Sequence, residues 1–537
     1  MNLPVDALTW TGAALPIVVL LVLLVYRRWS AVEAGSIGAV AAIIVACTLY
    51  RTPADVLAGE IAKAVWNSVS ILAVIFPAIL IYEVNREAGS FKVIERELAR
   101  LIPDKLLQIL TIGWCFSSFL QGPSGFGVPI AVTAPLLISI SVRPLWAVLI
   151  PLLAHAWANT FGTLALAWEA LVQQTGISGD AYWQAAWWTG ILTGMLCLLA
   201  GGAICWFYGG LAALRRGCPA VLLLGGIQAG GQLLLSQIAP TLSTVIATSA
   251  AMGAAFWLAR TRLYRQPAME TSPILSGPKT VIPAPAAANG EKEPRRLTFH
   301  EAMLPYYLLV AISIFVLLTP PVTRFLGQWQ TGFSFPETVT GYGVVNPAHA
   351  VYSPVSWLTH SGFFLLLSAV LSALYFAARG CLGRAGVGRS LRDSTRKFAP
   401  AAISTAFLLV MSKVMGGSGQ VDVLARGTAV VAGDFFILLS PMVGMIGSFM
   451  SASNVSSNIL FGQFQASIAS LTGKSSVLFL AAQTSGGAIG TMLSPSKILL
   501  GTTTANIVGS EGEIIRKLLG IACVAAVLTG VIVFVFA

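Results

Sequence analysis

Long apolar runs separated by short polar segments follow one another along almost the whole chain. Each run has about 15–25 residues, which is the length of a helix crossing roughly 30 Å of hydrocarbon, or of part of a broken crossing. The pattern predicts an all-α polytopic membrane protein with about 13 full or broken spans. The continuous spans are expected at residues 12–27, 31–50, 64–84, 186–208, 219–238, 241–259, 303–320, 357–378, 398–416 and 518–537.

Two segments interrupt the apolar pattern, the first with Gly and Pro that a regular helix does not allow, and the second with a cluster of Ser and Asn. The first is FLQGPSGFGVPIAVTAPLL at 119–137, and the second is FMSASNVSSNILFGQFQASI at 449–468. Clustered Gly and Pro break a helix, and open backbone at membrane depth survives only where it is buried in protein or lines a wet cavity. We therefore expect two re-entrant hairpins, with arms at 106–120/128–142 and 430–450/459–472 and tips at 121–127 and 451–458.

Each expected hairpin is followed by a polar segment inside an apolar run. These segments are HAWANTFGTLA at 155–165, within a span at 145–170, and QTSGGAIGTMLSPSK at 483–497, within a span at 475–510. The order of hairpin tip and then broken helix, met twice, is typical of an inverted repeat with a binding site near the midplane. Small residues that only permit close helix packing are the alternative. The domains predicted are two membrane halves, 1–260 and 303–537, joined by a flexible cytoplasmic linker at 261–302.

The composition agrees with this class of protein. The chain is 56% hydrophobic and 10% charged, which is too little charge for a soluble protein of 537 residues. The net charge of +11 does not indicate a nucleic-acid partner, because most Lys and Arg fall in alternate loops. That distribution follows the positive-inside rule and places both termini outside a prokaryotic cell membrane.

No cofactor, metal site or disulfide is expected. The seven cysteines form no CxxC pair and no cluster with histidine, and no P-loop is present. A long polar segment at 321–356 is expected to be an external loop without an assigned role. The sequence leaves the oligomeric state open, with a homodimer among the options.

Four segments together resemble the L-lactate permease family of prokaryotic lactate and glycolate permeases. They are FLQGPSGFGVPIAVTAPLL, AHAWANTFGTLALAWE, SASNVSSNILF and QTSGGAIGTMLSPSKILLGTTTANIVGSEGE. The resemblance implies a secondary transporter of the cytoplasmic membrane that takes up 2-hydroxy monocarboxylates (L-lactate, D-lactate or glycolate) together with protons. It also implies kinship with transporters that use re-entrant hairpins and an elevator motion.

The chain departs from the family pattern at two positions. Some members carry Glu at the position of Gln121 and Asp at that of Asn454, whereas both residues are amides here. An amide binds carboxylates and hydroxyls but cannot carry a proton. Sodium symport is therefore an open alternative, since backbone carbonyls and hydroxyls at helix breaks can hold Na⁺.

Uncharged donors and acceptors crowd the tips and the breaks. A carboxylate beside a hydroxyl needs several donors and one acceptor, so these groups suit a 2-hydroxy acid. Free N–H groups at half-helix N-termini suit its negative charge. The predicted substrate-binding residues are Gln121, Ser124, Gly125, Phe126, Gly127, Asn159, Thr160, Ser453, Asn454, Ser457, Asn458, Gln483, Thr484 and Ser485.

Two titratable residues are candidates for proton coupling. His155 is the one histidine within the expected repeat core, and Glu169 lies near the outer end of its span. A neutral histidine bonding across helices and an interfacial acid reaching water are the alternatives. Lys413 is expected to extend toward the outer interface, while Lys497 either faces the anion pathway or closes a helix C-terminus.

Two other functional classes remain as rivals. An intramembrane enzyme needs an acid pair, a Ser/His dyad or metal ligands within the membrane, and the sequence offers one deep histidine without HExxH. A channel is less compatible with two matched hairpins than alternating access is. A secondary transporter is the function that the sequence predicts, with no catalytic residue.

Overall fold

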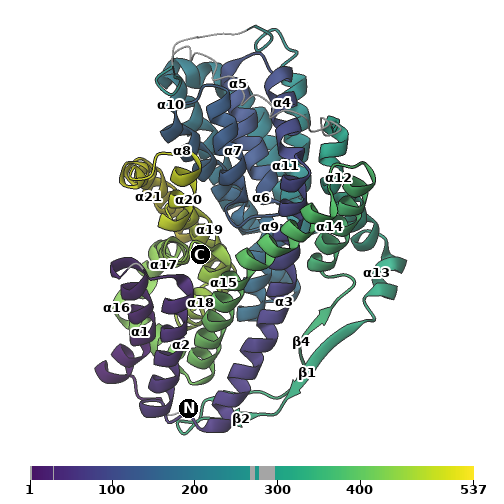
Figure 1. Cartoon of the computed structure of the whole chain (residues 1–537). Helices are drawn as coiled ribbons and strands as arrows, with labels where there is room; N and C mark the ends of the chain where they lie inside the picture. Colours follow the sequence, from purple (N-terminus) through teal and green to yellow (C-terminus); the bar gives the residue numbers. More distant parts are fainter. Residues whose placement is uncertain (1–2, 28, 267–271, 277–296) are drawn as a thin grey trace.

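The computed structural model describes residues 3–27, 29–266, 272–276 and 297–537, and within these ranges it is mainly helical (Figure 1). Eleven helices of the described part are long and apolar enough to cross a membrane, or twelve if the bent pair formed by residues 144–159 and 162–175 is one span. The prediction of a helical polytopic membrane protein is confirmed.

The described part of the first half contains eleven α-helices. The 58-residue α10 covers two of the expected spans, and its backbone leaves helical geometry at Gly209 and Gly210. The elements are α1 (Ala7–Leu21, continued by a π-turn Val22–Tyr26), α2 (Ala31–Thr48), α3 (Ala54–Glu87), α4 (Ser90–Leu101), α5 (Lys105–Ile109, continued by a π-helix Leu110–Phe116), α6 (Ser117–Gln121), α7 (Val128–Ser139), α8 (Pro144–Ala156, with a 3-10 turn Trp157–Asn159), α9 (Gly162–Thr175), α10 (Gly179–Ser236) and α11 (Pro240–Leu258).

The second half repeats much of this order. A 34-residue helix, a shorter helix, a hairpin and a broken helix again follow one another. The elements are α12 (Phe299–Leu317), α13 (Pro320–Leu326), α14 (Ser361–Ala378), α15 (Arg384–Gly417), α16 (Gln420–Ala432, followed by a 3-10 turn Gly433–Phe435), α17 (Phe436–Ser451), α18 (Asn454–Leu471), α19 (Ser476–Thr491), α20 (Pro495–Thr504) and α21 (Glu511–Phe536).

The two 34-residue helices, α3 and α15, form the centre of the scaffold, where they pack along one another (Figure 1). Helices of each half cover the other half reciprocally. α2 packs on α15 as α14 packs on α3, and α1 packs on α16 as α12 packs on α4.

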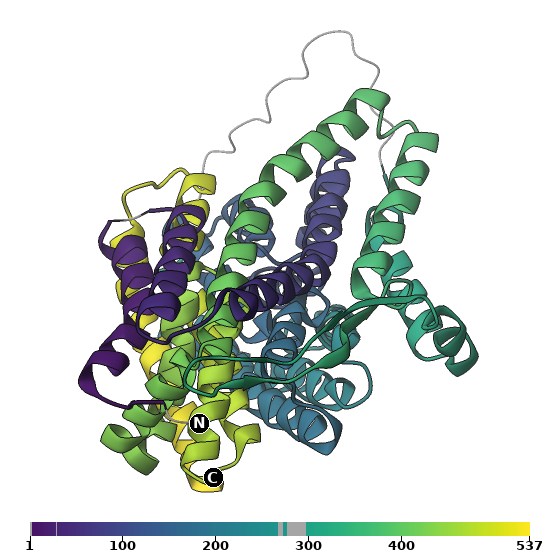
Figure 2. The same cartoon turned by 90° about the horizontal axis from the view of Figure 1, so that it is seen from below.

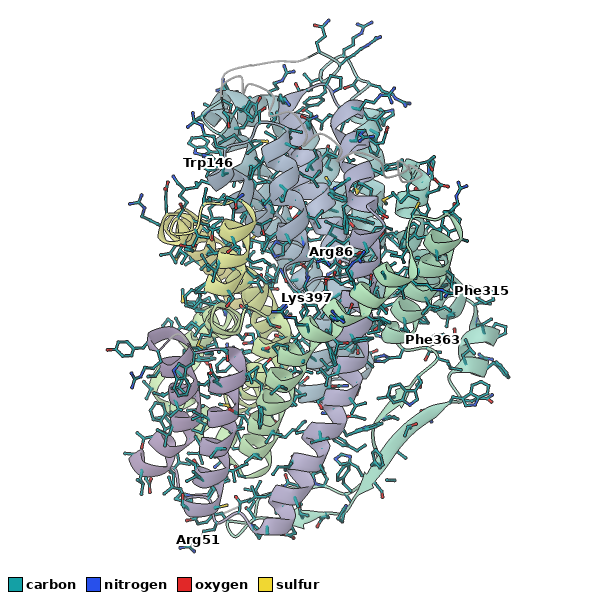
Figure 3. The ribbon with its side chains drawn as sticks, in the orientation of Figure 1. Arg51, Arg86, Trp146, Phe315, Phe363 and Lys397 are labelled. Atoms are coloured by element: carbon teal, nitrogen blue, oxygen red, sulfur yellow. The ribbon has the colours of Figure 1, made fainter. Side chains whose placement is uncertain are left out.

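An ion-pair cluster joins α3 to α15 near one end of the two helices. The Glu83 carboxylate is fully buried and lies 2.5 Å from Lys397 Nζ and 2.8 Å from an Arg86 guanidinium nitrogen. Arg86 also contacts Asp393 at 2.6 Å, and Figure 3 shows Arg86 and Lys397 close together where the helices meet. The cations are partly exposed, so only the carboxylate depends entirely on its partners.

The loops near residues 104, 143, 216, 274 and 517 lie at one face, here called the linker face. Arg143 N–H donates to the Ile274 carbonyl at 2.8 Å, and Arg216 pairs with Asp104 at 2.8 Å. Lys517 Nζ lies 5.1 Å from the Trp146 ring. Both chain termini lie at the bottom of the view in Figure 2, on the side of the molecule away from the linker face.

The predicted linker at 261–302 is only partly described, because 267–271 and 277–296 lie outside the described residues. Its central piece, 272–276, is docked. Ser276 N–H donates to the Ser141 carbonyl at 2.8 Å, and Ile274 is completely buried. Thr298 caps α12 through a capping box with Glu301, so this helix begins four residues before the expected boundary at 303.

The expected external loop 321–356 contains strand structure that the all-α prediction missed. β1 (Gln330–Phe335) pairs antiparallel with β4 (His349–Ser356), and β2 (Thr338–Val339) pairs with β3 (Val345–Asn346). This β-ribbon is fixed to the scaffold. Trp66 Nε1 of α3 donates to the Tyr352 carbonyl at 3.2 Å, and Asn346 Nδ2 donates to the Gly417 carbonyl of α15 at 3.0 Å. The side of the molecule that it covers is here called the ribbon face.

Candidate substrate site

Two helical hairpins, α5–α7 and α17–α18, and two broken helices, α8–α9 and α19–α20, are present, and the bonds at the hairpin ends lie toward opposite faces. The first hairpin runs from Asp104 to Arg143, both at the linker face. The return arm of the second ends toward the ribbon face, where Ser467 Oγ lies 3.4 Å from Asp422. α9 reaches the ribbon face, because Gln174 near its end lines a pocket together with Asn346.

The tip of the first hairpin interlocks with the first helix break through unusual backbone. Residues 125–127 have φ values of +46 to +86°, and residues 163–165 have φ values of +51 to +63°. Leu164 N–H donates to the Gly122 carbonyl at 2.9 Å, and Gly125 lies against Thr163 Oγ1, so the two left-handed stretches are in contact. Left-handed backbone at non-glycine residues is costly and concentrates at functional sites.

Gly125 is the point of closest approach, and its replacement by alanine should disable the site. The new Cβ would collide with Thr163 Oγ1, and the backbone has a φ of +53°. We expect G125A to reduce transport at least about tenfold while the protein still folds, because one clash at a tip is local. Uptake normalised to monodisperse protein in proteoliposomes measures this. G473A is the matched control, since that surface glycine also has positive φ but open space around it. Equal losses in both variants would contradict the local role of Gly125.

The first hairpin tip is bonded to the first helix break, which is bonded in turn to the second. Gln121 Nε2 donates to Asn159 Oδ1 at 3.2 Å. Asn159 Nδ2 in turn donates to Thr491 Oγ1 at 3.0 Å, at the last residue of α19. The sequence missed Thr491, which lies inside the quoted polar segment but six residues beyond the last residue selected there. The two breaks therefore face one another.

The second hairpin tip is bonded to the first break and to α19. Asn454 Nδ2 donates to Thr160 Oγ1 at 3.1 Å and to the Thr484 carbonyl at 3.1 Å. Asn458 Nδ2 donates to Thr484 Oγ1 at 2.9 Å and to the Ala167 carbonyl at 2.8 Å. All four of these polar side chains are buried, so the contacts are shielded from water.

A third group of polar residues joins α18 to its neighbours α17 and α19. Gln483 Nε2 donates to Ser457 Oγ at 3.1 Å, and Ser457 Oγ donates to the Gly444 carbonyl at 2.7 Å. Gln465 Nε2 donates to Gln483 Oε1 at 3.1 Å and Gln465 Oε1 accepts from Ser440 Oγ at 2.9 Å. Sequence reasoning missed Gln465 and Ser440, because an isolated polar residue on an apolar helix gives no sign of what it faces.

Several buried polar atoms around this junction have no hydrogen-bond partner in the described part of the chain. They include acceptors and hydroxyls, namely Gln121 Oε1, Asn454 Oδ1, Asn458 Oδ1, His155 Nε2, Ser485 Oγ and Ser494 Oγ. Most buried polar atoms in proteins are bonded, so a concentration of unpaired ones calls for a partner. A small molecule with both acceptor and donor groups meets that requirement.

The remaining predicted residues take no part in the hydrogen bonds of the junction. Ser124 Oγ donates to the carbonyl of Leu120 in its own hairpin arm, and Ser453 caps α18 through the Ser456 N–H. Phe126 is 39% exposed at the tip, and Gly127 lies against Leu500 of α20. Ser485 is buried beside Thr484 without a partner.

The two proton-coupling candidates are separated. His155 is fully buried at the end of α8, and its Nδ1 lies 2.5 Å from the Pro151 carbonyl. That acceptor fixes the proton on Nδ1 and leaves Nε2 with a lone pair. Glu169 is exposed and lines a cavity of about 530 Å³ beneath the β-ribbon, together with Ser70 and His360.

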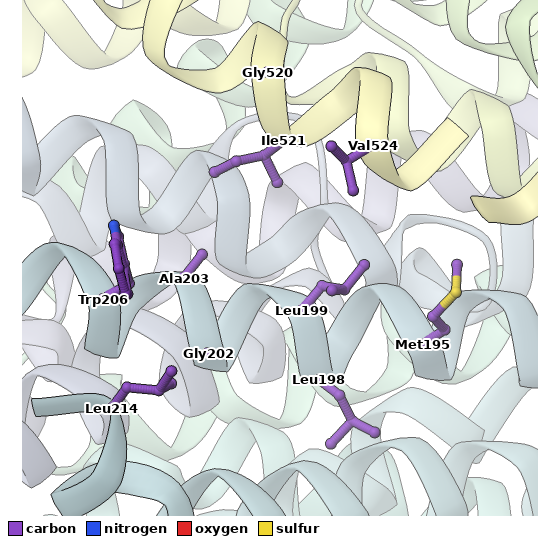
Figure 4. Close-up of a pocket in the computed structure, with 10 residues that line it drawn as sticks. All are labelled: Met195, Leu198, Leu199, Gly202, Ala203, Trp206, Leu214, Gly520, Ile521 and Val524. Carbon is purple, nitrogen blue, oxygen red and sulfur yellow. The ribbon is translucent and has the colours of Figure 1, made fainter. Parts of the chain in front are cut away.

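Other cavities differ in chemistry from the junction. A groove of about 640 Å³ between α10 and α21 is lined almost wholly by apolar side chains, so it cannot hold a carboxylate (Figure 4). A polar cavity of about 270 Å³ lies under the β-ribbon, lined by Glu60, Lys63 and Lys413 among others. Lys413 Nζ lies 5.9 Å from the Tyr352 ring there.

Comparison with known proteins identifies the family. The family model described as L-lactate permease matches residues 9–537. The chain belongs to the L-lactate permease family. It is 26% identical over 538 residues to an L-lactate permease of Salmonella typhimurium, covering 97% of this chain and 94% of that one. It is 27% identical to an L-lactate permease of Bacillus subtilis over 96% of this chain and 93% of that one, and 27% identical to the glycolate permease GlcA of Escherichia coli over 97% and 94%.

Among solved structures, the YdaH transporter of Alcanivorax borkumensis is similar to this member of the family, with a TM-score of 0.45 and 13% identity, covering 87% of this chain and 85% of that one. Since the curated relatives are permeases, this L-lactate permease family member is a multi-pass membrane transporter of a small molecule and not an enzyme.

Proposed function

We propose that this permease takes up L-lactate and related 2-hydroxy monocarboxylates, D-lactate and glycolate, by proton symport. The observation that carries the proposal is the junction at which Asn454, Thr160 and Thr484 join a hairpin tip, a helix break and α19. Buried polar atoms without partners surround this junction. Relatives named for lactate and glycolate support the substrate class.

The available groups match the parts of a 2-hydroxy acid. Its carboxylate needs donors, which the Ser485 and Ser494 hydroxyls and the amide N–H groups of Gln121 and Asn159 supply when they exchange their present partners. Its hydroxyl needs an acceptor, and His155 Nε2 is a buried lone pair without a donor. In the empty site the amide N–H groups of Gln121 and Asn159 bond to other side chains, and they exchange these bonds for bonds to the substrate when it binds.

We further propose that the halves are inverted repeats that alternate access by an elevator-type motion. The reciprocal packing of α2 and α14 on the two long helices supports a two-fold relation within the membrane. The hairpins that enter from opposite faces support it as well. In this proposal α3 and α15, joined by the Glu83 cluster, remain still while the hairpins and broken helices move.

The proposed location is the cytoplasmic membrane of a prokaryotic cell, with the linker face inside. Basic residues concentrate at the linker face, as the positive-inside rule requires for cytoplasmic loops. The β-ribbon and both termini then lie outside.

An uptake experiment with two separate gradients tests substrate and coupling ion. We expect purified protein in proteoliposomes to accumulate radiolabelled L-lactate when the lumen is alkaline, and unlabelled glycolate and D-lactate to compete. A protonophore should remove the accumulation, and protein-free liposomes are the control. Accumulation driven only by an inward Na⁺ gradient would replace proton coupling by sodium coupling. No uptake of any of the three acids under either gradient would overturn the substrate assignment.

A further inference from the structure

Lys497 is a buried lysine for which the described part of the fold supplies no counter-charge. Its side chain lies in the first turn of α20, directly after the break that follows Thr491, and it is only 7% exposed. No carboxylate of the described residues lies within ion-pair distance of it, and no hydrogen bond to its ammonium group is present in that part of the chain. An unpaired charge buried in this way is expensive and in membrane proteins marks function.

Lys497 has no role in capping or stabilising a helix end. Closing a helix C-terminus, one of the two sequence-based options, does not apply, because Lys497 is the third residue of α20 and α19 ends at Thr491. The N-terminal end of a helix carries partial positive charge, so a cation there is repelled and an anion is attracted. Beside it, Ser494 Oγ is fully buried without a partner. These features together describe an anion site.

The groups around Lys497 leave it free to pair with a substrate. α20 packs against α7, α8 and α21. Within those helices α7 has no titratable residue and α8 has only His155. The charged residues of α21 lie toward the other end of α20, where Glu511 accepts from Thr502 Oγ1 at 2.6 Å and Glu513 pairs with Lys517 at 3.5 Å; Arg516 follows on the same turn.

The site also lies next to the first hairpin tip. Leu500, one turn after Lys497, lies beneath Gly127, and Gly501 lies against Val148 of α8. Lys497 precedes these two residues in α20 and follows Thr491, to which Asn159 donates, by six positions in the chain.

We propose that Lys497 binds the carboxylate of the substrate and carries the coupled proton. The inference rests on the proposed function and assigns its coupling group, which the amides Gln121 and Asn454 cannot be. In the empty carrier Lys497 is a neutral amine, because no anion balances a charge there. One proton from outside and one carboxylate bind together and form a neutral ammonium–carboxylate pair. Inside, the anion leaves and the ammonium returns its proton to water, so one proton and one anion cross and no net charge moves.

Calorimetry and transport of position-497 variants test this role. Titration of L-lactate in two buffers of different ionisation enthalpy measures the protons bound with the substrate, and wild-type protein should take up about one proton per lactate. K497Q should bind lactate roughly tenfold or more weakly, because a charge-assisted bond is lost. K497R should bind lactate with about zero proton uptake, since arginine keeps its proton.

Transport assays distinguish K497R from wild type in a second way. K497R should exchange internal for external lactate, because the loaded pair is neutral, but should not accumulate lactate in response to a pH gradient, because the empty carrier cannot return with a fixed charge. K474Q is the matched control, since Lys474 is partly exposed in the turn before α19, and it should behave as wild type. Unchanged binding and pH-driven uptake in K497Q, or one proton per lactate in K497R, would overturn the role of Lys497 alone. Wild-type protein that neither binds nor transports any of the three acids would overturn the proposed function and this inference with it.

Discussion

Alanine at position 454 should abolish lactate uptake while the helices remain folded. Asn454 Nδ2 donates to Thr160 Oγ1 and to the Thr484 carbonyl, so this single amide connects the second hairpin tip to the first helix break and to α19. Its Oδ1 also packs against Gly487, where a Cβ would collide with it. Loss of several buried hydrogen bonds at this junction should raise the free-energy barrier to transport by about 2–4 kcal/mol, which corresponds to roughly 30-fold to 1,000-fold in transport rate.

Initial rates of pH-driven uptake in proteoliposomes measure the effect of N454A. S470A is the matched control, because Ser470 is an exposed residue of the same helix, and it should transport normally. Circular dichroism and gel filtration of N454A should match wild type. A variant N454A that transports within about twofold of wild type would remove the junction from the transport site, since a twofold change is under ~0.5 kcal/mol.

Removal of the two cations beside Glu83 should destabilise the protein more than removal of Glu83 itself. Glu83 is fully buried, whereas the side chains of Arg86 and Lys397 are 38% and 49% exposed. In R86Q/K397Q a buried carboxylate loses both counter-charges, which costs about 3–5 kcal/mol. In E83Q the cations turn toward water and the amide keeps some bonds, so the cost is about 1–2 kcal/mol.

Thermal unfolding midpoints of the purified variants in one detergent give the order of stability. The expected order is wild type, then E83Q, then R86Q/K397Q. R100Q is a control for loss of an exposed arginine at the linker face, and its midpoint should equal that of wild type. A lower midpoint for E83Q than for the double variant would show that the cations, and not the carboxylate, depend on the cluster.

The helical architecture was predictable because the bilayer imposes it. Spans of fixed length must be apolar, and every break must be polar or rich in Gly and Pro, so the pattern indicates where long helices run and where they are interrupted. The second tip is tighter than expected, since α18 already begins at Asn454 and places Ser457 and Asn458 within a helix. The Ser and Asn residues of this tip also cap and begin α18, so the sequence pattern does not show where the tip ends and the helical arm begins.

Other features were missed because they depend on distant partners. The β-ribbon alternates in the way of strands, as in His349–Ser356, but contacts that fix it come from α3 and α15, which lie far along the chain. The left-handed stretch at 163–165 contains a threonine, a leucine and an alanine, residue types that do not predict such backbone. Lys497 could be recognised as an unpaired cation only once its neighbours were known.

Native cysteines lie near both of the opposite faces, so they allow the orientation of the protein in the membrane to be measured. Cys47 is exposed one residue before the end of α2, near Arg51, whose carbonyl accepts from Gly341 of the ribbon segment. Cys218 is exposed close to Arg216 at the linker face. A membrane-impermeant maleimide followed by peptide mass spectrometry can therefore read orientation in intact cells without an introduced thiol. Modification of Cys47 before lysis and of Cys218 only after it is the result expected if the β-ribbon faces the medium.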